Sequence, residues 1–205
     1  MPSDTTSHFR YAHGNRGRGR LRSIFILASL LLATACIPEP DLKNTQLYSN
    51  AGIKFKYPGN WRISEEDTNN HSHYLIVHTN RDGILTMHQF KGGFSPTLNQ
   101  FADTMTGYYI EEMGEEFVKE LKAEPSELSI SNKSMPAIAE THTIEDQGQR
   151  LPMVRYYSRL DDPAGWIYIS FQSPADSFQE EKPGFQLILD TVQNVKQEET
   201  NQEPQ

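Results

Sequence analysis

The sequence predicts an α+β fold in which an antiparallel β-sheet is flanked by helices, as in an α/β/α sandwich. Several segments alternate apolar and polar residues with the period of two that is typical of half-buried strands. Turn-forming residues separate neighbouring segments, which favours antiparallel pairing. Two other stretches repeat apolar residues every three or four positions, the spacing of an amphipathic helix. The order of strands, long helix, strands and short helix is typical of α+β domains.

The first predicted strands precede the long helix. Residues 53–57 alternate apolar side chains with lysines, and a Pro-Gly-Asn turn follows them. Residues 74–79 and 84–90 form a predicted hairpin, joined by a turn whose Asp-Gly supplies a positive φ. Trp61, just after the opening turn, has two interpretations: an exposed platform for a ligand or a buried anchor of the core. We expect the buried anchor, because large aromatic side chains contribute most when they are packed inside.

Two helices and four further strands complete the predicted domain. The longer helix is predicted over residues 98–122, and Thr97 followed by Gln100 fits a capping box at its start. The shorter helix is predicted over residues 184–195, with Pro183 near its beginning. The strands expected between these helices are residues 127–132, 136–144, 153–160 and 166–172.

The N-terminal region has the pattern of a bacterial lipoprotein signal. Four arginines precede residues 24–35, an apolar run shorter than the roughly 20 residues that span a bilayer. The run ends in Leu-Ala-Thr-Ala-Cys, which resembles the lipobox whose cysteine is lipidated and becomes the mature N-terminus. Cys36 in this motif is the single cysteine of the chain. We therefore expect lipidation at Cys36; the alternatives are an ordinary cleaved signal or an uncleaved anchor with an incidental cysteine.

The same pattern divides the chain into four parts. Residues 1–35 are the predicted signal peptide, and residues 36–47 are the lipidated cysteine and a Pro-containing tether. Residues 48–196 form one predicted domain, and residues 197–205 form a polar tail that we expect to be disordered.

The charge of the chain excludes some classes of partner. The formal net charge is −8, and residues 1–35 carry five arginines and one aspartate, so the rest carries −12. A strongly acidic domain argues against nucleic-acid binding and against electrostatic adhesion to anionic lipid. Membrane attachment would then depend on the acyl chains, of which two or three hold firmly.

Histidines and glutamates are the candidate ligand-binding groups. Four histidines fall within the predicted hairpin region and are the basis of an alternative function, zinc or copper binding. No familiar metal-ligand spacing connects them, so surface histidines without a metal remain the simpler interpretation. Glutamates at i,i+4 spacing along residues 111–120 would attract a cation or a basic partner, but a solvated helix face explains them better. The four histidines are His71, His73, His78 and His88.

The domain also resembles a known family. The opening GIKFKYPGNW is similar to the start of PsbP-like and DcrB-like domains, and residues 185–192 are similar to their terminal helix. This resemblance implies an α/β/α sandwich used largely as a non-enzymatic assembly or binding module, including in bacterial envelope lipoproteins.

These observations predict a non-catalytic accessory or protein-binding module, anchored to the membrane at Cys36 and facing an unidentified envelope partner. We expect no enzymatic activity and no cofactor, because the chain contains no Gly-x-Ser-x-Gly, phosphate-loop, HExxH or dinucleotide motif. Ile37 replaces the aspartate that commonly signals inner-membrane retention in Gram-negative bacteria. In such a bacterium we expect the periplasmic face of the outer membrane.

Overall fold

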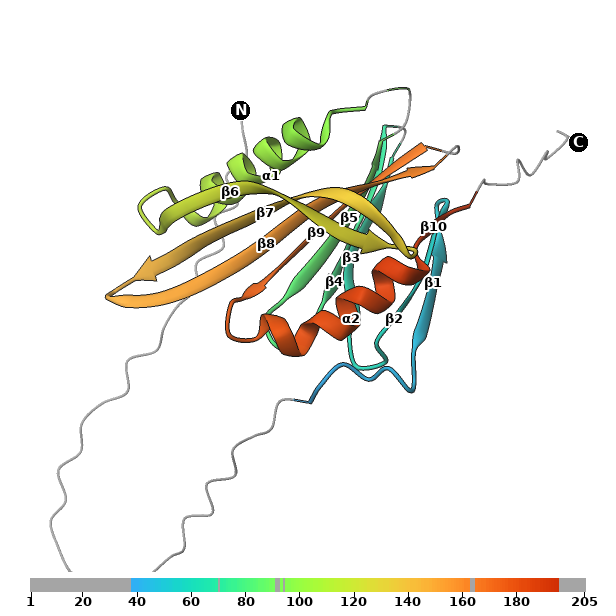
Figure 1. Ribbon diagram of the computed structural model, residues 1–205, viewed down its shortest axis with the longest axis horizontal. Coiled ribbons are helices and arrows are strands. Elements are labelled where there is room, and N and C mark those ends of the chain that lie inside the picture. Colours follow the sequence, from blue (N-terminus) through green and yellow to red (C-terminus); the bar gives the residue numbers. More distant parts are fainter. Residues whose placement is uncertain (1–37, 70, 91–92, 94, 163–164, 196–205) are drawn as a thin grey trace, which may run out of the picture. The chain divides into compact units, whose positions relative to one another are not determined.

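The computed structural model describes residues 38–69, 71–90, 93, 95–162 and 165–195. Within them the chain forms two antiparallel β-sheets and two α-helices (Figure 1). This architecture agrees with the predicted α+β class. The predicted signal peptide, Cys36 and the whole predicted tail, residues 197–205, lie outside the described residues.

The larger sheet has seven strands in the described part of the chain, in the spatial order β3-β4-β5-β9-β8-β7-β6. Every neighbouring pair is antiparallel, and the sheet is open, with β3 and β6 at its edges. The strands are β3 Arg62–Thr68, β4 Ser72–His78, β5 Ile84–Phe90, β6 Val118–Ile130, β7 Lys133–Asp146, β8 Gln149–Asp162 and β9 Gly165–Pro174.

A smaller sheet covers part of one face together with helix α2 (Phe178–Thr191). It consists of β1 (Gln46–Asn50), β2 (Ile53–Tyr57) and the short β10 (Gln193–Asn194), with β2 in the centre. Helix α1 (Leu98–Met113) packs on the opposite face of the larger sheet, against β7 and β8. The result is a layered domain with one helix on each face of the seven-stranded sheet.

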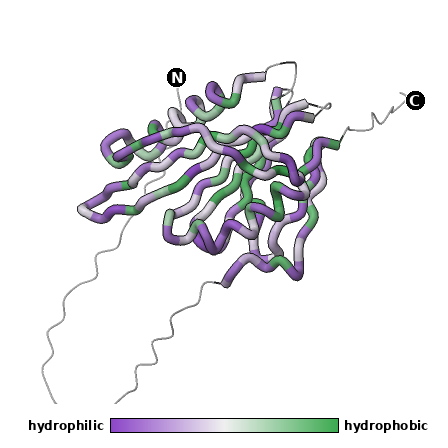
Figure 2. Tube along the Cα trace, in the orientation of Figure 1, coloured by the Kyte–Doolittle hydropathy of each residue, from purple (hydrophilic) through white to green (hydrophobic). Residues whose placement is uncertain are grey.

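The alternation of side chains separates two cores. Leu75 of β4 lies opposite Met87 of β5, and both join the larger core between the sheet, α2 and β2. The neighbouring pair Tyr74 and His88 points to the other face, where a smaller aromatic core centred on Phe101 lies beneath α1. In Figure 2 the hydrophobic residues gather in the central strands and in α2. The long β6–β8 hairpins are more hydrophilic.

Helix α1 is shorter than predicted. The capping box is confirmed, because the Thr97 hydroxyl accepts from the Gln100 amide and the Gln100 side chain accepts from the Thr97 amide. The prediction that the helix continues to residue 122 is wrong. Gly114 ends the helix with φ of 94°, a conformation that costs glycine little, and β6 begins four residues later. Pairing with β7 along residues 118–130 outweighs the helical spacing of the apolar residues there.

Helix α2 starts earlier than the predicted residue 184. It begins at Phe178, and Pro183 lies inside it. Glu181 explains this extension, because its buried carboxylate accepts hydrogen bonds from the hydroxyls of Thr79 and Ser173. These contacts tie the first turn of α2 to the β4–β5 turn and to β9. No local sequence signal reveals them.

Trp61 is a core residue, as predicted. Its side chain is 3% exposed, and its ring lies 5.1 Å from the Phe185 ring of α2 in an edge-on contact. Gly184 allows this approach, since a Cβ atom there would lie 2.4 Å from Trp61 Cζ2. The opening turn and α2 are therefore joined through one indole. Neither helix in the described part of the chain has the length and apolarity needed to cross a bilayer.

Candidate functional site

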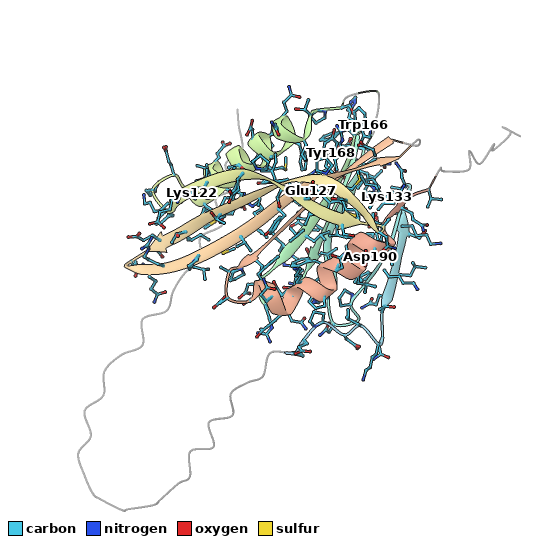
Figure 3. All side chains as sticks on the ribbon, in the orientation of Figure 1. Lys122, Glu127, Lys133, Trp166, Tyr168 and Asp190 are labelled. Atoms are coloured by element: carbon cyan, nitrogen blue, oxygen red, sulfur yellow. The ribbon has the colours of Figure 1, made fainter. Side chains whose placement is uncertain are left out.

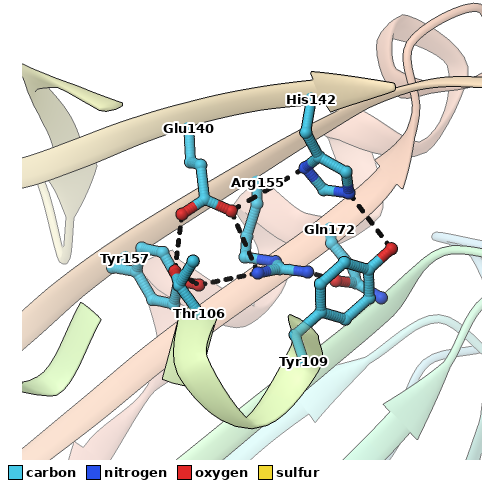
Figure 4. Close-up of polar contacts among 7 residues, drawn as sticks. All are labelled: Thr106, Tyr109, Glu140, His142, Arg155, Tyr157 and Gln172. Atoms are coloured by element: carbon cyan, nitrogen blue, oxygen red, sulfur yellow. Dashed lines mark hydrogen bonds and ion pairs between the residues drawn. The ribbon is translucent and has the colours of Figure 1, made fainter. Parts of the chain in front are cut away.

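A buried polar cluster lies on the sheet face that α1 covers. Residues of three neighbouring strands and of the helix converge there (Figure 4). The strand register explains the convergence: Glu140 of β7 lies directly opposite Arg155 of β8, and Arg155 lies opposite Gln172 of β9. We call this set the Arg155 cluster. Its members are Thr106, Tyr109, Glu140, His142, Arg155, Tyr157 and Gln172.

The centre of the cluster is an ion pair. Arg155 Nη1 lies 3.0 Å from Glu140 Oε1, and both side chains are only 3% exposed. Arg155 also donates to the Tyr157 hydroxyl at 2.9 Å and, through Nε, to Gln172 Oε1 at 2.8 Å. Thr106 of α1 donates to Glu140 Oε2 at 2.5 Å. Burial makes such a pair costly unless each charge is bonded, and here the surrounding hydroxyls and amide supply those bonds.

Tyr109 of α1 covers the ion pair from the helix side and contacts His142 of β7. The Tyr109 ring lies 3.9 Å from Arg155 Cζ, a close cation–π contact. The Tyr109 hydroxyl lies 3.1 Å from His142 Nε2. Burial, reinforced by the charge of Arg155, lowers the pKa of His142 to about 4, so its imidazole is neutral near pH 7. Burial also raises the pKa of Tyr109 and of Tyr157.

These directions decide what chemistry the cluster favours. A general acid or base works best when its pKa lies near the working pH. Burial lowers the pKa of His142 to below neutrality. It raises the pKa values of Tyr109 and Tyr157, which already lie above neutrality, so all three move away from that optimum. None of these three groups therefore has a pKa near neutrality.

Two grooves run along the sides of α1. The β6 groove, of about 460 Å³, lies between α1 and β6–β7, with Thr106 and Glu140 among its lining residues. The β5 groove, of about 360 Å³, lies on the other side of α1, with Arg155 and Gln172 among its lining residues. Both volumes fall within the range of small-ligand sites. The apolar lining comes from Ile110, Leu121 and Ile138 in the β6 groove, and from Ile76, Ile84, Met105 and Met113 in the β5 groove.

The cluster has hydrogen-bonding capacity to spare. Arg155 Nη2 and His142 Nδ1 are buried and have no hydrogen-bond partner among the described residues, although His142 Nδ1 lies 3.7 Å from Glu140 Oε1. A buried donor without an acceptor costs roughly 1–3 kcal/mol. A ligand carbonyl or hydroxyl would remove that cost only by reaching Nη2 after the covering Tyr109 ring moves aside, because Nη2 has no solvent contact. The charge of Arg155 is already balanced by Glu140, so a neutral acceptor fits better than an anion.

The structure does not bring the four predicted histidines together. His73 points to the α2 side of the sheet, fully buried, where Nε2 lies 3.1 Å from the Tyr48 hydroxyl and 3.4 Å from Glu66. His88 points to the α1 side and stacks on Tyr74. The sheet itself separates the two imidazoles, so the metal-site hypothesis for His71, His73, His78 and His88 is wrong. Within the described residues, no group of three or more histidines, cysteines and carboxylates is placed to hold a metal ion.

The glutamate row also has no common surface. Glu111 and Glu112 are exposed on α1, whereas Glu120 lies on β6 and pairs with Arg150 at 2.7 Å. The shorter helix removes the single face on which these carboxylates were expected. The solvated interpretation therefore holds for the residues that remain on α1.

Sequence reasoning missed the Arg155 cluster. Its residues come from four elements, and no motif contains them. One signal was present: Glu140 and Arg155 occupy positions at which strand alternation predicts burial, beside residues such as Met153 and Tyr157. A charged residue at a position expected to face the core, in each of two strands, suggests a buried ion pair. The strand register was needed to show that Glu140 and Arg155 lie opposite each other.

Comparison with known proteins gives structural neighbours only. No protein-family model matches the chain, and no curated protein sequence matches it. LpqN, a protein involved in cell envelope biogenesis of Mycobacterium tuberculosis, has a TM-score of 0.36 and 11% identity, covering 75% of this chain and 91% of LpqN. A Bacteroides thetaiotaomicron protein has a TM-score of 0.44 and 14% identity, covering 75% of this chain and 48% of that one.

A protein of unknown function from Pseudomonas aeruginosa is similar at a TM-score of 0.30 and 11% identity, covering 70% of this chain and 92% of that chain. The neighbours thus include a bacterial cell-envelope protein. Structural similarity at these TM-scores is too low to indicate a shared function.

Proposed function

We propose that this protein is a lipid-anchored, cell-envelope binding module that acts without catalysis and holds a partner protein on the face covered by α1. The observation that carries the proposal is the Arg155 cluster between two apolar grooves. Recognition sites commonly combine apolar walls with a few convergent polar groups. The PsbP-like resemblance of residues 52–61 and 185–192 supports the same class of non-enzymatic module.

The rims of the grooves support a protein partner. Tyr108, 63% exposed, lines the β5 groove, and Leu121, 42% exposed, lines the β6 groove. Tyrosine and arginine are enriched among the residues that dominate protein–protein binding. An apolar side chain of the partner would occupy a groove, and a backbone carbonyl beside it would accept from Arg155 once the covering Tyr109 ring moves aside. A segment of a partner protein thus supplies both an apolar side chain for the groove and a neutral hydrogen-bond acceptor for Arg155.

Site-specific photocrosslinking tests the partner. Benzoylphenylalanine at position 108 should capture a partner of defined mass in intact cells, whereas the same probe at position 56, exposed on β2 on the other side of the domain, should not. Met113→Trp, which narrows the β5 groove at its lining, should weaken capture from position 108. Equal capture from both positions, or capture unaffected by Met113→Trp, would contradict the proposed face.

The lipid anchor has its own test. Cells are fed an alkyne fatty acid, and labelling of the wild-type chain is compared with that of Cys36→Ala. Labelling should be present in the wild type and absent from the variant, with Cys36→Ala no longer retained by its acyl chains. Labelling that persists in Cys36→Ala would refute lipidation at this residue.

A further inference from the structure

Residues 39–46, which belong to the tether expected over residues 36–47, are hydrogen-bonded to the domain. Asn60, in the opening turn, holds them from both sides: its Oδ1 accepts from the Asp41 amide at 2.8 Å, and its Nδ2 donates to the Glu39 carbonyl at 2.8 Å. The Gly59 amide donates to the Asp41 carbonyl at 3.0 Å, and Gln46 Nε2 donates to the Gly59 carbonyl at 2.8 Å.

The attachment is a tightly fitted contact. A Cβ atom at Gly59 would lie 2.0 Å from the Asn44 carbonyl oxygen, so only glycine fits at this position. Asp41 closes a local turn by accepting from the amides of Lys43 and Asn44, each at 3.1 Å. Residues 39–46 and the turn at residues 58–60 therefore form one surface, which we call the docked end.

Covalent geometry limits how far the lipid can be from this surface. Cys36 precedes Glu39 by three residues, and an extended chain spans at most about 3.6 Å per residue, so the two lie within roughly 11 Å. Leu42, 45% exposed on the docked end, adds an apolar side chain beside the attachment point. Figure 1 places residues 38–44 and α1 at opposite ends of the domain.

We propose that the docked end is the surface that rests on the lipid bilayer, with the α1 face and its two grooves directed away from it. This inference rests on the proposed lipid anchor at Cys36. A tether of a dozen residues would let the domain turn far from the lipid, whereas only two residues separate Cys36 from the first docked contact at Glu39. With the docked end on the bilayer, the two grooves face away from the membrane. A partner that lies in the space outside this membrane, or on a membrane opposite to it, can then reach them.

Depth-dependent quenching in vesicles tests the orientation. The lipidated full-length protein is purified from membranes with one new cysteine, Lys43→Cys on the docked end or Tyr108→Cys on α1, and labelled with bimane; acylated Cys36 does not react. Both positions are exposed. In phosphatidylcholine vesicles containing nitroxide-labelled lipid, we expect at least about twofold stronger quenching at position 43 than at position 108, because only position 43 lies near the lipid attachment point.

A linker insertion provides the matched control. Twelve Gly/Ser residues between Ile37 and Pro38 add a mean span of roughly 20 Å outside the folded contacts, and should reduce quenching at position 43 to the level at position 108. Equal quenching at the two positions, or quenching at position 43 that the insertion leaves unchanged, would overturn the orientation. Intact-mass analysis distinguishes the failures: a chain without acyl mass on Cys36 overturns both proposals, whereas an acylated chain with equal quenching overturns this one alone.

Discussion

Arg155 and Glu140 show how single residues define the candidate site. Their charges are buried, lie 3.0 Å apart and are bonded by Thr106, Tyr157 and Gln172. Such a pair adds little net stability, but loss of one member leaves the other uncompensated. The pair places a polar group in the lining of each groove, Glu140 in the β6 groove and Arg155 in the β5 groove. We therefore expect it to contribute more to the specificity of binding than to the stability of the fold.

Arg155→Met should reduce the free energy of unfolding by about 3–5 kcal/mol, because Glu140 is left charged and buried. The double variant Arg155→Met/Glu140→Leu should recover most of this loss, since neither charge remains in the interior. Urea unfolding of the wild type, both single variants and the double variant measures the effect. The exposed pair Arg150–Glu120 is the control, and Arg150→Met should leave the unfolding midpoint nearly unchanged. Strictly additive losses would contradict the interpretation.

His88 predicts a pH dependence of stability. Burial among Tyr74, Phe90 and Phe101 lowers its pKa from 6.5 to about 4, so the folded state binds fewer protons than the unfolded state between these values. Its contribution is complete above pH 6.5 and is lost as the pH falls towards 4. Burial raises the pKa of Glu181, which acts in the opposite sense, because stability falls as the pH rises above that carboxyl's ordinary pKa.

A comparison of variants isolates the histidine. The loss of melting temperature between pH 7 and pH 4.5 should be smaller in His88→Phe than in the wild type, because phenylalanine keeps the ring contacts and binds no proton. His71→Ala, at an exposed position, serves as the control and should follow the wild type. Parallel curves for wild type and His88→Phe would show that His88 titrates normally.

At the scale of elements, α2 depends on contacts that are distant in sequence. Its first turn is tied to the β4–β5 turn through Glu181, and its middle packs on the opening turn through Trp61. The C-terminal end of α2 continues into β10, which pairs with β2. The helix therefore joins the small sheet to the large one.

Trp61→Ala should lower the free energy of unfolding by about 3–5 kcal/mol, because it removes a buried indole from this junction. Gly184→Ala should also destabilise, since its new Cβ would lie 2.4 Å from Trp61 Cζ2. Combined with Trp61→Ala, the glycine substitution should cost much less, because only the contact of the new Cβ with Pro58 Cγ, at 3.0 Å, then remains. Thermal unfolding of the soluble fragment 37–205 measures all three variants. Losses that add would indicate that Gly184 is required for its backbone rather than for its contact with Trp61.

The edge strand β6 carries features that disfavour the addition of another strand. Figure 3 shows the exposed Lys122 and Glu127 on this strand. Pro125 lies in the middle of the strand and cannot donate a backbone hydrogen bond to another chain. Charged side chains and a proline at an edge disfavour strand addition. The grooves beside α1 are therefore a better binding surface than the free edge of β6.

At the scale of the molecule, the acidic charge and the anchor lead to one further prediction. Without residues 1–35 the chain carries a net charge of −12. Fragment 37–205, which has no acyl chain, should not bind to and float with phosphatidylglycerol vesicles even at low ionic strength, because like charges repel. Vesicle flotation at low and high salt measures this. Binding that weakens with salt would reveal a basic surface and contradict an attachment that depends on acyl chains alone.

The sequence by itself determined the α+β class, the succession of strands, long helix, strands and short helix along the chain, the capping box at Thr97 and the burial of Trp61. These features follow from local periodicity, turn chemistry and residue size, which a short window of sequence contains. The lipid-anchor prediction at Cys36 has the same local origin.

The tertiary structure decided what depends on pairing between distant segments. Strand pairing ended α1 at Met113 in spite of a helical spacing that continues beyond it, and Glu181 extended α2 before Pro183. The sheet separated His73 from His88, and the register of β7, β8 and β9 joined Glu140, Arg155 and Gln172. The physical reason is the same in each case: a buried polar or charged group takes its partner from another strand or helix, and no local pattern specifies that partner.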